Sequence, residues 1–185
     1  MMRDLKSLPQ RFIRDLRGVA AIEFVILAPI MIVMFLGVAE LGLALLVNRK
    51  VITTAFTIGD LTARDDVVSN NELNNIFRAG ELSMRPYPET TLSMRISTIQ
   101  LDSSNNALVR ESCAQGDFSP LATNSTVTPP PGLLLAEDDS FILAEVEYGF
   151  TSAIASLNPS GVWDLGNTFR QRPRQGLLVD LPNNC

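Results

Sequence analysis

The chain has 185 residues, of which 46% are hydrophobic and 19% charged, and its formal net charge is −5. It contains no histidine, which excludes Ser-His and Cys-His nucleophile pairs, histidine metal sites and the usual general base near neutral pH. Residues 1–18 hold five Lys and Arg against two Asp, so the remaining residues carry a net charge of −8. A basic start followed by an acidic remainder is typical of membrane topology and argues against a nucleic-acid partner.

Residues 19–47 are almost entirely apolar and predict a membrane-spanning helix. As one helix the segment is about 43 Å long, which exceeds the ~30 Å hydrocarbon core of a bilayer. Basic flanks stay on the cytoplasmic side, so we expect a cytoplasmic leader over residues 1–18 and an exported domain over residues 48–185. Pro29 lies inside the helix, removes one backbone hydrogen bond and predicts a kink or local loosening there.

Two helical segments are expected after the span. The first continues the membrane helix to about Arg64 and presents one apolar face to the exported domain. That face is formed by residues at helical spacing: Val47, Val51, Ala55, Ile58 and Leu61. The second helix covers Asn70–Leu82 and is ended by the prolines within residues 85–88. Its apolar side is formed by Leu73, Ile76, Phe77 and Leu82.

The second half of the chain is expected to form strands. Residues 92–99 alternate between apolar and polar, and residues 107–112 are a hairpin partner after a turn at 102–106. Residues 117–132 are expected to form a loop with polyproline character. The clearest strand pattern is Phe141–Thr151, and a last strand is expected over Leu177–Leu181. One long helix against a small antiparallel sheet is an α+β, pilin-like arrangement.

Both cysteines, Cys113 and Cys185, fall in the part expected to be exported. An even cysteine count in an oxidising compartment is typical of a disulfide, which here would close a long loop and tether the C-terminus. In the chain-entropy model such a link contributes roughly 3–5 kcal/mol. The alternative is two unpaired thiols.

A glycine stands at the border between the basic and apolar segments, in Arg17-Gly-Val-Ala-Ala-Ile-Glu-Phe24. A secretory signal has a shorter apolar stretch followed by a small-residue cleavage motif, and this chain has neither. Cleavage after Gly18 would make Val19 the new N-terminus and Glu23 the fifth residue of the mature chain. A carboxylate inside a membrane helix costs about 2.5–3.5 kcal/mol, so Glu23 needs a partner such as the α-ammonium of Val19. The alternative is that Glu23 lies near the membrane surface and is hydrated.

Residues 17–42 resemble the TadE-like family of minor pseudopilins, which belongs to the tight-adherence (Flp) type IV pilus machinery. The similarity rests on the glycine, the Glu-Phe pair, the proline and the later Glu-x-Gly, and residues 58–64 fit the family's helical extension. It implies cleavage after Gly18 by an inner-membrane prepilin peptidase. It also implies a non-enzymatic subunit, without metal or cofactor, that assembles with other pseudopilins and inner-membrane pilus proteins. The residues expected to act in processing and docking are Gly18, Val19, Glu23, Phe24, Pro29 and Glu40.

Some interpretations stay open at this point. Glu40 either pairs with a neighbouring helix or reaches the outer membrane surface. Gly37 and Gly42 offer a close-packing face to another membrane helix. The acidic residues 137–139 are interpreted as a solvated loop rather than a cation site. The alternative function is an uncleaved single-pass anchor whose periplasmic domain binds a ligand or a protein.

Overall fold

The structure is a computed structural model that describes residues 18–104, 106–129, 139–152, 161–182 and 185. The expected leader therefore lies outside the described residues, except for Gly18. The chain divides into two compact units, Met1–Gly42 and Leu43–Cys185. Helix α2 (Val19–Thr62) begins in the first unit and ends in the second.

In the first unit, α2 is apolar on all sides and its large side chains are exposed. Phe24 is 68% exposed, Phe35 73% and Val38 70%. A helix that is apolar all round needs an apolar environment on every face. Among the described residues, α2 is the one helix long and apolar enough to cross a membrane. At about 1.5 Å per residue its 44 residues exceed what a bilayer requires, so the remainder is available to the second unit.

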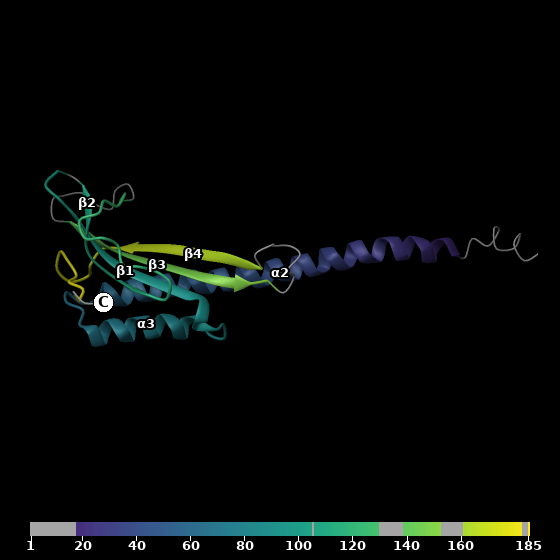
Figure 1. The fold of residues 1–185 in the computed structure, drawn as a ribbon, viewed down its shortest axis with the longest axis horizontal. Coiled ribbons are helices and arrows are strands. Elements are labelled where there is room, and N and C mark those ends of the chain that lie inside the picture. Colours follow the sequence, from purple (N-terminus) through teal and green to yellow (C-terminus); the bar gives the residue numbers. More distant parts are fainter. Residues whose placement is uncertain (1–17, 105, 130–138, 153–160, 183–184) are drawn as a thin grey trace, which may run out of the picture. The chain divides into compact units, whose positions relative to one another are not determined.

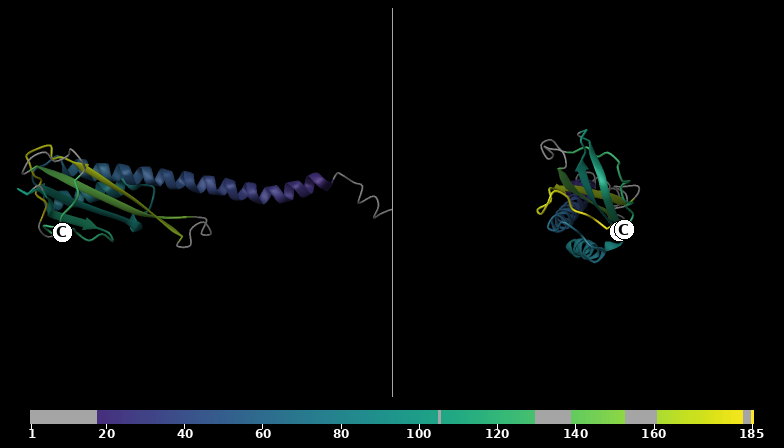
Figure 2. Two further views of the ribbon diagram at one scale, coloured as in Figure 1. Left: turned by 90° about the horizontal axis from the view of Figure 1, so that it is seen from above. Right: turned by 90° about the vertical axis from the view of Figure 1, so that its left-hand side faces the viewer.

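The second unit contains an antiparallel sheet of four strands in the order β2-β1-β3-β4. The strands are β1 (Leu92–Leu101), β2 (Ala107–Gln115), β3 (Ser140–Thr151) and β4 (Val162–Gln171). Figure 1 shows the sheet with the C-terminal part of α2, and Figure 2 shows that α2 and α3 (Asn70–Met84) lie on the same side of it. The α+β class is confirmed, and the first three strands occur where the sequence predicts them.

The strand predicted at Leu177–Leu181 is wrong, and β4 was not predicted. Val179 and Leu181 are buried, as their alternation suggests, but the backbone of Asp180 between them pairs with a loop and not with a strand of the sheet. Val68 N donates to Asp180 O and Asp180 N donates to Asp66 O, each at 2.9 Å. The fourth strand of the sheet is β4, whose ten residues pair with β3.

The main core lies between the sheet and the two helices. The predicted apolar face of α2 is confirmed, because Val47, Val51, Ala55 and Ile58 are all 0% exposed. The sheet contributes to this core mainly through one face of each of the two central strands, β1 and β3. The core residues on these strands are Leu92, Met94, Ile96, Ile142, Ala144, Val146 and Tyr148. The predicted alternation of β3 is therefore confirmed, with Glu145 and Glu147 on the opposite face.

Helix α3 packs on a slightly different face from the one predicted. Leu82 is 48% exposed, whereas Met84 is 0% exposed and Gly80 is buried. Gly80 allows a close approach, since a Cβ there would lie 2.5 Å from Met94 Sδ. Residues 73, 76, 77, 80 and 84 form one row at helical spacing, and Leu82 is two positions away from that row.

The opposite face of the sheet is partly covered by the loop that follows β2. A second core cluster contains Ile99, Leu101, Ala107, Val109, Phe141 and Leu143, with Leu121 and Val127 packed against it. Arg95 pairs with Glu145 at 2.8 Å, donates to Ser119 O at 2.9 Å and lies 4.9 Å from the centre of the Phe118 ring. Residues 117–129 thus form the expected loop, and Arg95 holds it against β1 and β3.

Candidate functional site

The candidate processing site lies at the beginning of α2. Gly18 is exposed, has a 3-10 helical conformation and directly precedes the first α-helical residue, Val19. A Cβ built on Gly18 would meet no atom within 4 Å, and the backbone φ of Gly18 lies outside the left-handed region. The fold of the described residues therefore has no steric need for glycine at this position. A requirement for glycine here would come from a molecule that binds this segment.

Glu23 and Val19 are four positions apart on α2. Positions i and i+4 of a helix are neighbours on one face, so the Glu23 carboxylate lies one turn from the backbone nitrogen of Val19. Glu23 and Phe24 are both exposed within the described residues. The helix assignment continues through Pro29, which is also exposed. These side chains are thus presented outward on an apolar helix.

Glu40 differs from Glu23 because it is only 7% exposed. The glycines on either side of it have open surroundings. A Cβ built on Gly37 or on Gly42 would meet no atom within 4 Å. As at Gly18, the described chain itself gives no steric reason for glycine at either position.

Cys113 and Cys185 form a disulfide, as predicted. Their Cα atoms are 5.2 Å apart and 72 positions separate them in the sequence. Cys113 lies on β2 and is 0% exposed, so the bond ties the last residue of the chain to the sheet. The C-terminal segment is also held by Thr98 Oγ1, which donates to Val179 O at 2.9 Å.

A charged cluster at the end of α2 was not identified from the sequence. Asp60 is the centre of this cluster. Arg64 follows Asp60 by four positions and donates to its carboxylate at 2.8 Å, and Arg174 contacts the other carboxylate oxygen. The hydrogen bond from Arg64 lowers the pKa of Asp60 below its usual value of 3.8; burial opposes this, and the charge of Arg174 lowers the pKa further. Arg174 N also donates to Ala63 O at 2.8 Å. The cluster fastens the segment after β4 to α2.

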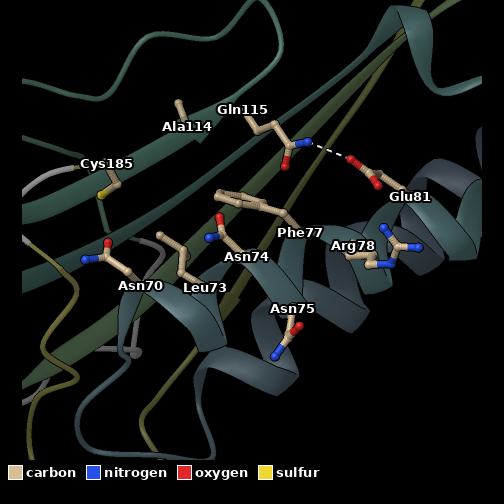
Figure 3. A pocket seen from close by; sticks show the side chains of 10 residues that line it. All are labelled: Asn70, Leu73, Asn74, Asn75, Phe77, Arg78, Glu81, Ala114, Gln115 and Cys185. Carbon is tan, nitrogen blue, oxygen red and sulfur yellow. Dashed lines mark hydrogen bonds between the residues drawn. The ribbon is translucent and has the colours of Figure 1, made fainter.

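A shallow groove of about 560 Å³ lies between α3 and β2 (Figure 3). Its lining includes the amide side chains of Asn70, Asn74 and Asn75 on α3. Gln115 on β2 donates through Nε2 to Glu81 Oε1 at 2.6 Å across the groove. Over the described part of the chain, no group of three or more His, Cys, Asp and Glu side chains is placed to hold a metal ion. Residues 137 and 138 of the acidic loop lie outside the described residues.

Comparison with known proteins gives one finding for this chain. A family model described as TadE-like protein matches residues 18–58. A search of curated proteins and a search of solved structures each found no match. The match covers the candidate processing site, the apolar part of α2 and the core-facing turns that follow it. It confirms the resemblance seen in the sequence: the segment from Gly18 to Ile58 is similar to TadE-like proteins, a family associated with Tad pili.

Proposed function

We propose that the chain is a minor pseudopilin of the Tad (Flp) pilus, a structural and assembly subunit without enzymatic activity. In this proposal it spans the bacterial inner membrane once, with its leader in the cytoplasm and residues 48–185 in the periplasm. A prepilin peptidase removes the leader after Gly18. The observation that carries the proposal is the family match, which begins at Gly18 itself and runs through the whole apolar helix.

The surroundings of Gly18 support cleavage at this position. Nothing in the described fold needs a glycine there, since a side chain would enter open space. A protease that reads an exposed segment before a helix would supply the missing requirement. Cleavage leaves a mature chain that starts with the first residue of α2.

The exposed apolar helix supports assembly with other membrane helices. Removal of the basic leader leaves Val19 with a free ammonium group one helical turn from Glu23. A carboxylate within an apolar helix gains most from a charged partner, which its own ammonium or that of a neighbouring subunit supplies. The expected partners are other pseudopilins, and the helix is the part that meets them.

Processing is tested by the Gly18→Ala variant carrying a C-terminal tag. Loss of the leader removes 18 of 185 residues, about 2 kDa of the 20.2 kDa chain, which gel electrophoresis resolves. Wild type should be shortened in cells that contain the peptidase, and Gly18→Ala should stay full length. Gly42→Ala is the matched control, because Gly42 is in the same helix and also has open surroundings. If wild type stays full length beside an active peptidase, the chain is an uncleaved anchor and the proposal fails.

Docking is tested by replacing the carboxylate of Glu23. Glu23→Gln keeps the size of the side chain and removes its charge, so it should be cleaved normally but assemble poorly. Glu23→Asp retains the charge and should restore part of the piliation. Normal piliation of the Glu23→Gln strain would remove the docking role and leave the processing claim intact.

A further inference from the structure

Trp163 is the only tryptophan of the chain, and it lies near the start of β4. It pairs with Phe150 across the β3–β4 ladder and is 38% exposed, as is its neighbour Val162. Part of the Trp163 ring is therefore exposed, and the proposed processing and docking of α2 do not involve this residue. The position of Trp163 relative to α2 indicates what covers that exposed part.

Trp163 lies on the face of the sheet that packs against α2. Side chains of a strand alternate, so Trp163, Leu165 and Phe169 share one face. Phe169 identifies this face, because its ring lies 5.0 Å from the ring of Phe56. In addition, a Cβ on Gly59 would lie 2.6 Å from Phe169 Cδ1.

The height of Trp163 along α2 follows from the direction of β4. Phe169 lies beside Phe56, and further along the chain Arg174 N donates to Ala63 O at 2.8 Å, so β4 and α2 run the same way. Six strand residues separate Trp163 from Phe169, which is about 20 Å. On a helix about 20 Å corresponds to about 13 residues, which places Trp163 level with residues 43–46 of α2.

Two other observations agree with this height. Ala44 is 8% exposed and Val47 is 0% exposed, so the domain covers one side of α2 as far back as these residues. In Figures 1 and 2 the end of β4 that begins at Val162 lies at the end of the domain where α2 enters it.

At this same height α2 changes from apolar to charged. Leu43, Leu45 and Leu46 are 48–60% exposed, which requires lipid or another apolar partner around them. The first charged residues beyond them are Arg49 and Lys50, so the boundary between hydrocarbon and water falls close to this point. Tryptophan is enriched at this boundary, because its ring is amphipathic.

We propose that Trp163 inserts into the interfacial layer of the bilayer, at the surface where α2 leaves the membrane. The described ends of β3 and β4, at Thr151 and Val162, then rest on the lipid headgroups and form a second membrane contact beside the span. Asp164 is the next residue of β4, and its side chain lies on the other face of the sheet. Its charge keeps this end of β4 at the headgroups and so limits how deeply Trp163 enters the bilayer. Because the turns of α2 from Val47 to Ile58 are packed in the core of the domain, the second contact limits how far the domain can tilt relative to the membrane surface. This inference depends on α2 crossing the membrane but not on processing or on pilus assembly.

The test uses the fluorescence of the full chain in phosphatidylcholine–phosphatidylglycerol vesicles, where the chain's single tryptophan is the only indole present. Lipids brominated near the headgroup end of the acyl chain should reduce Trp163 emission by about two-fold or more, because an interfacial indole lies within reach of them. Bromines near the end of the acyl chain should quench less. Retention of the protein in the vesicles after a carbonate wash is measured separately and tests the span itself.

The matched control moves the tryptophan to the opposite end of the domain. In Trp163→Phe/Leu177→Trp the indole replaces an apolar residue that is 67% exposed and follows Arg174, which lies beside Ala63. Its emission should respond to acrylamide and not to brominated lipid. Trp163 emission that ignores brominated lipid in a retained protein would overturn the inference and leave the proposed function standing. Protection of Trp163 from acrylamide that depends on protein concentration would instead assign the surface to a second copy of the chain and also overturn it.

Discussion

The Cys113–Cys185 disulfide gives a prediction whose size follows from the position of its cysteines. The bond closes a loop of 72 positions and joins the chain's last residue to a strand that is 0% exposed at Cys113. In the chain-entropy model a loop of this length stabilises the folded state by about 4 kcal/mol. Reduction should therefore lower the free energy of unfolding of the second unit, Leu43–Cys185, by up to about this amount.

Pulse proteolysis in urea measures this change on the full chain in detergent. With a slope of about 2 kcal/mol per molar urea, a loss of about 4 kcal/mol moves the unfolding midpoint by about 2 M. Cys185→Ala is the control, since it removes the bond at the exposed end and leaves Cys113 as a small buried group. It should unfold at the midpoint of the reduced wild type, and reductant should not change it.

Two results would refute this reasoning. Alkylation of both thiols in the unreduced, folded protein would show that the bond is absent. An equal urea midpoint before and after confirmed reduction would show that the C-terminal segment is held by other contacts alone. Those contacts exist, because Val179 O accepts from Thr98 and Asp180 is bonded to the loop at residues 66–68.

Three further predictions concern the stability of the second unit, Leu43–Cys185. Gly116→Ala should cost more than about 1–2 kcal/mol of unfolding free energy, because φ is +81° and a Cβ would lie 2.5 Å from Leu92 O; urea denaturation measures it. Asp60 contributes stability that is complete above its unfolded pKa, near 4, and is lost as pH falls through the lower folded pKa. Wild type should thus lose stability more steeply than Asp60→Asn below about pH 4 in urea titrations at several pH values, and parallel curves would contradict the role of its arginine partners. Met84→Ala should cost about 2–5 kcal/mol and Leu82→Ala less than about 1 kcal/mol, and the reverse order would favour the helix face first predicted from the sequence.

The sequence predicts those parts of the fold whose pattern repeats at a fixed period. The buried face of α2 follows from helical spacing, and the two faces of β3 follow from alternation. Gly18, Glu23 and the apolar helix can also be identified from the sequence, because each differs in charge or hydrophobicity from the residues around it. A glycine at a charge border and a carboxylate in an apolar run need no tertiary structure to be noticed.

Other features depend on packing that no local pattern records. Strand β4 lies at the edge of the sheet and contains Gly166 and several polar residues, so its sequence lacks the alternation that predicts a strand. It is recognised as a strand only from its pairing with β3 in the structure. The segment 177–181 alternates like a strand, yet its backbone pairs with the loop at residues 66–68 and not with a strand. The height of Trp163 on α2 arises from the packing of Phe169 against Phe56, two residues more than a hundred positions apart.

The most direct test of the central claim is the N-terminus of the chain isolated from the membranes of cells that contain the Tad machinery. Mass spectrometry of the N-terminal peptide distinguishes a processed chain from an intact one. The proposed function predicts a mature chain that begins at Val19, with the basic leader absent and Glu23 as its fifth residue. A chain that begins at Met1 or Met2 would contradict the proposal and identify the protein as an uncleaved membrane anchor.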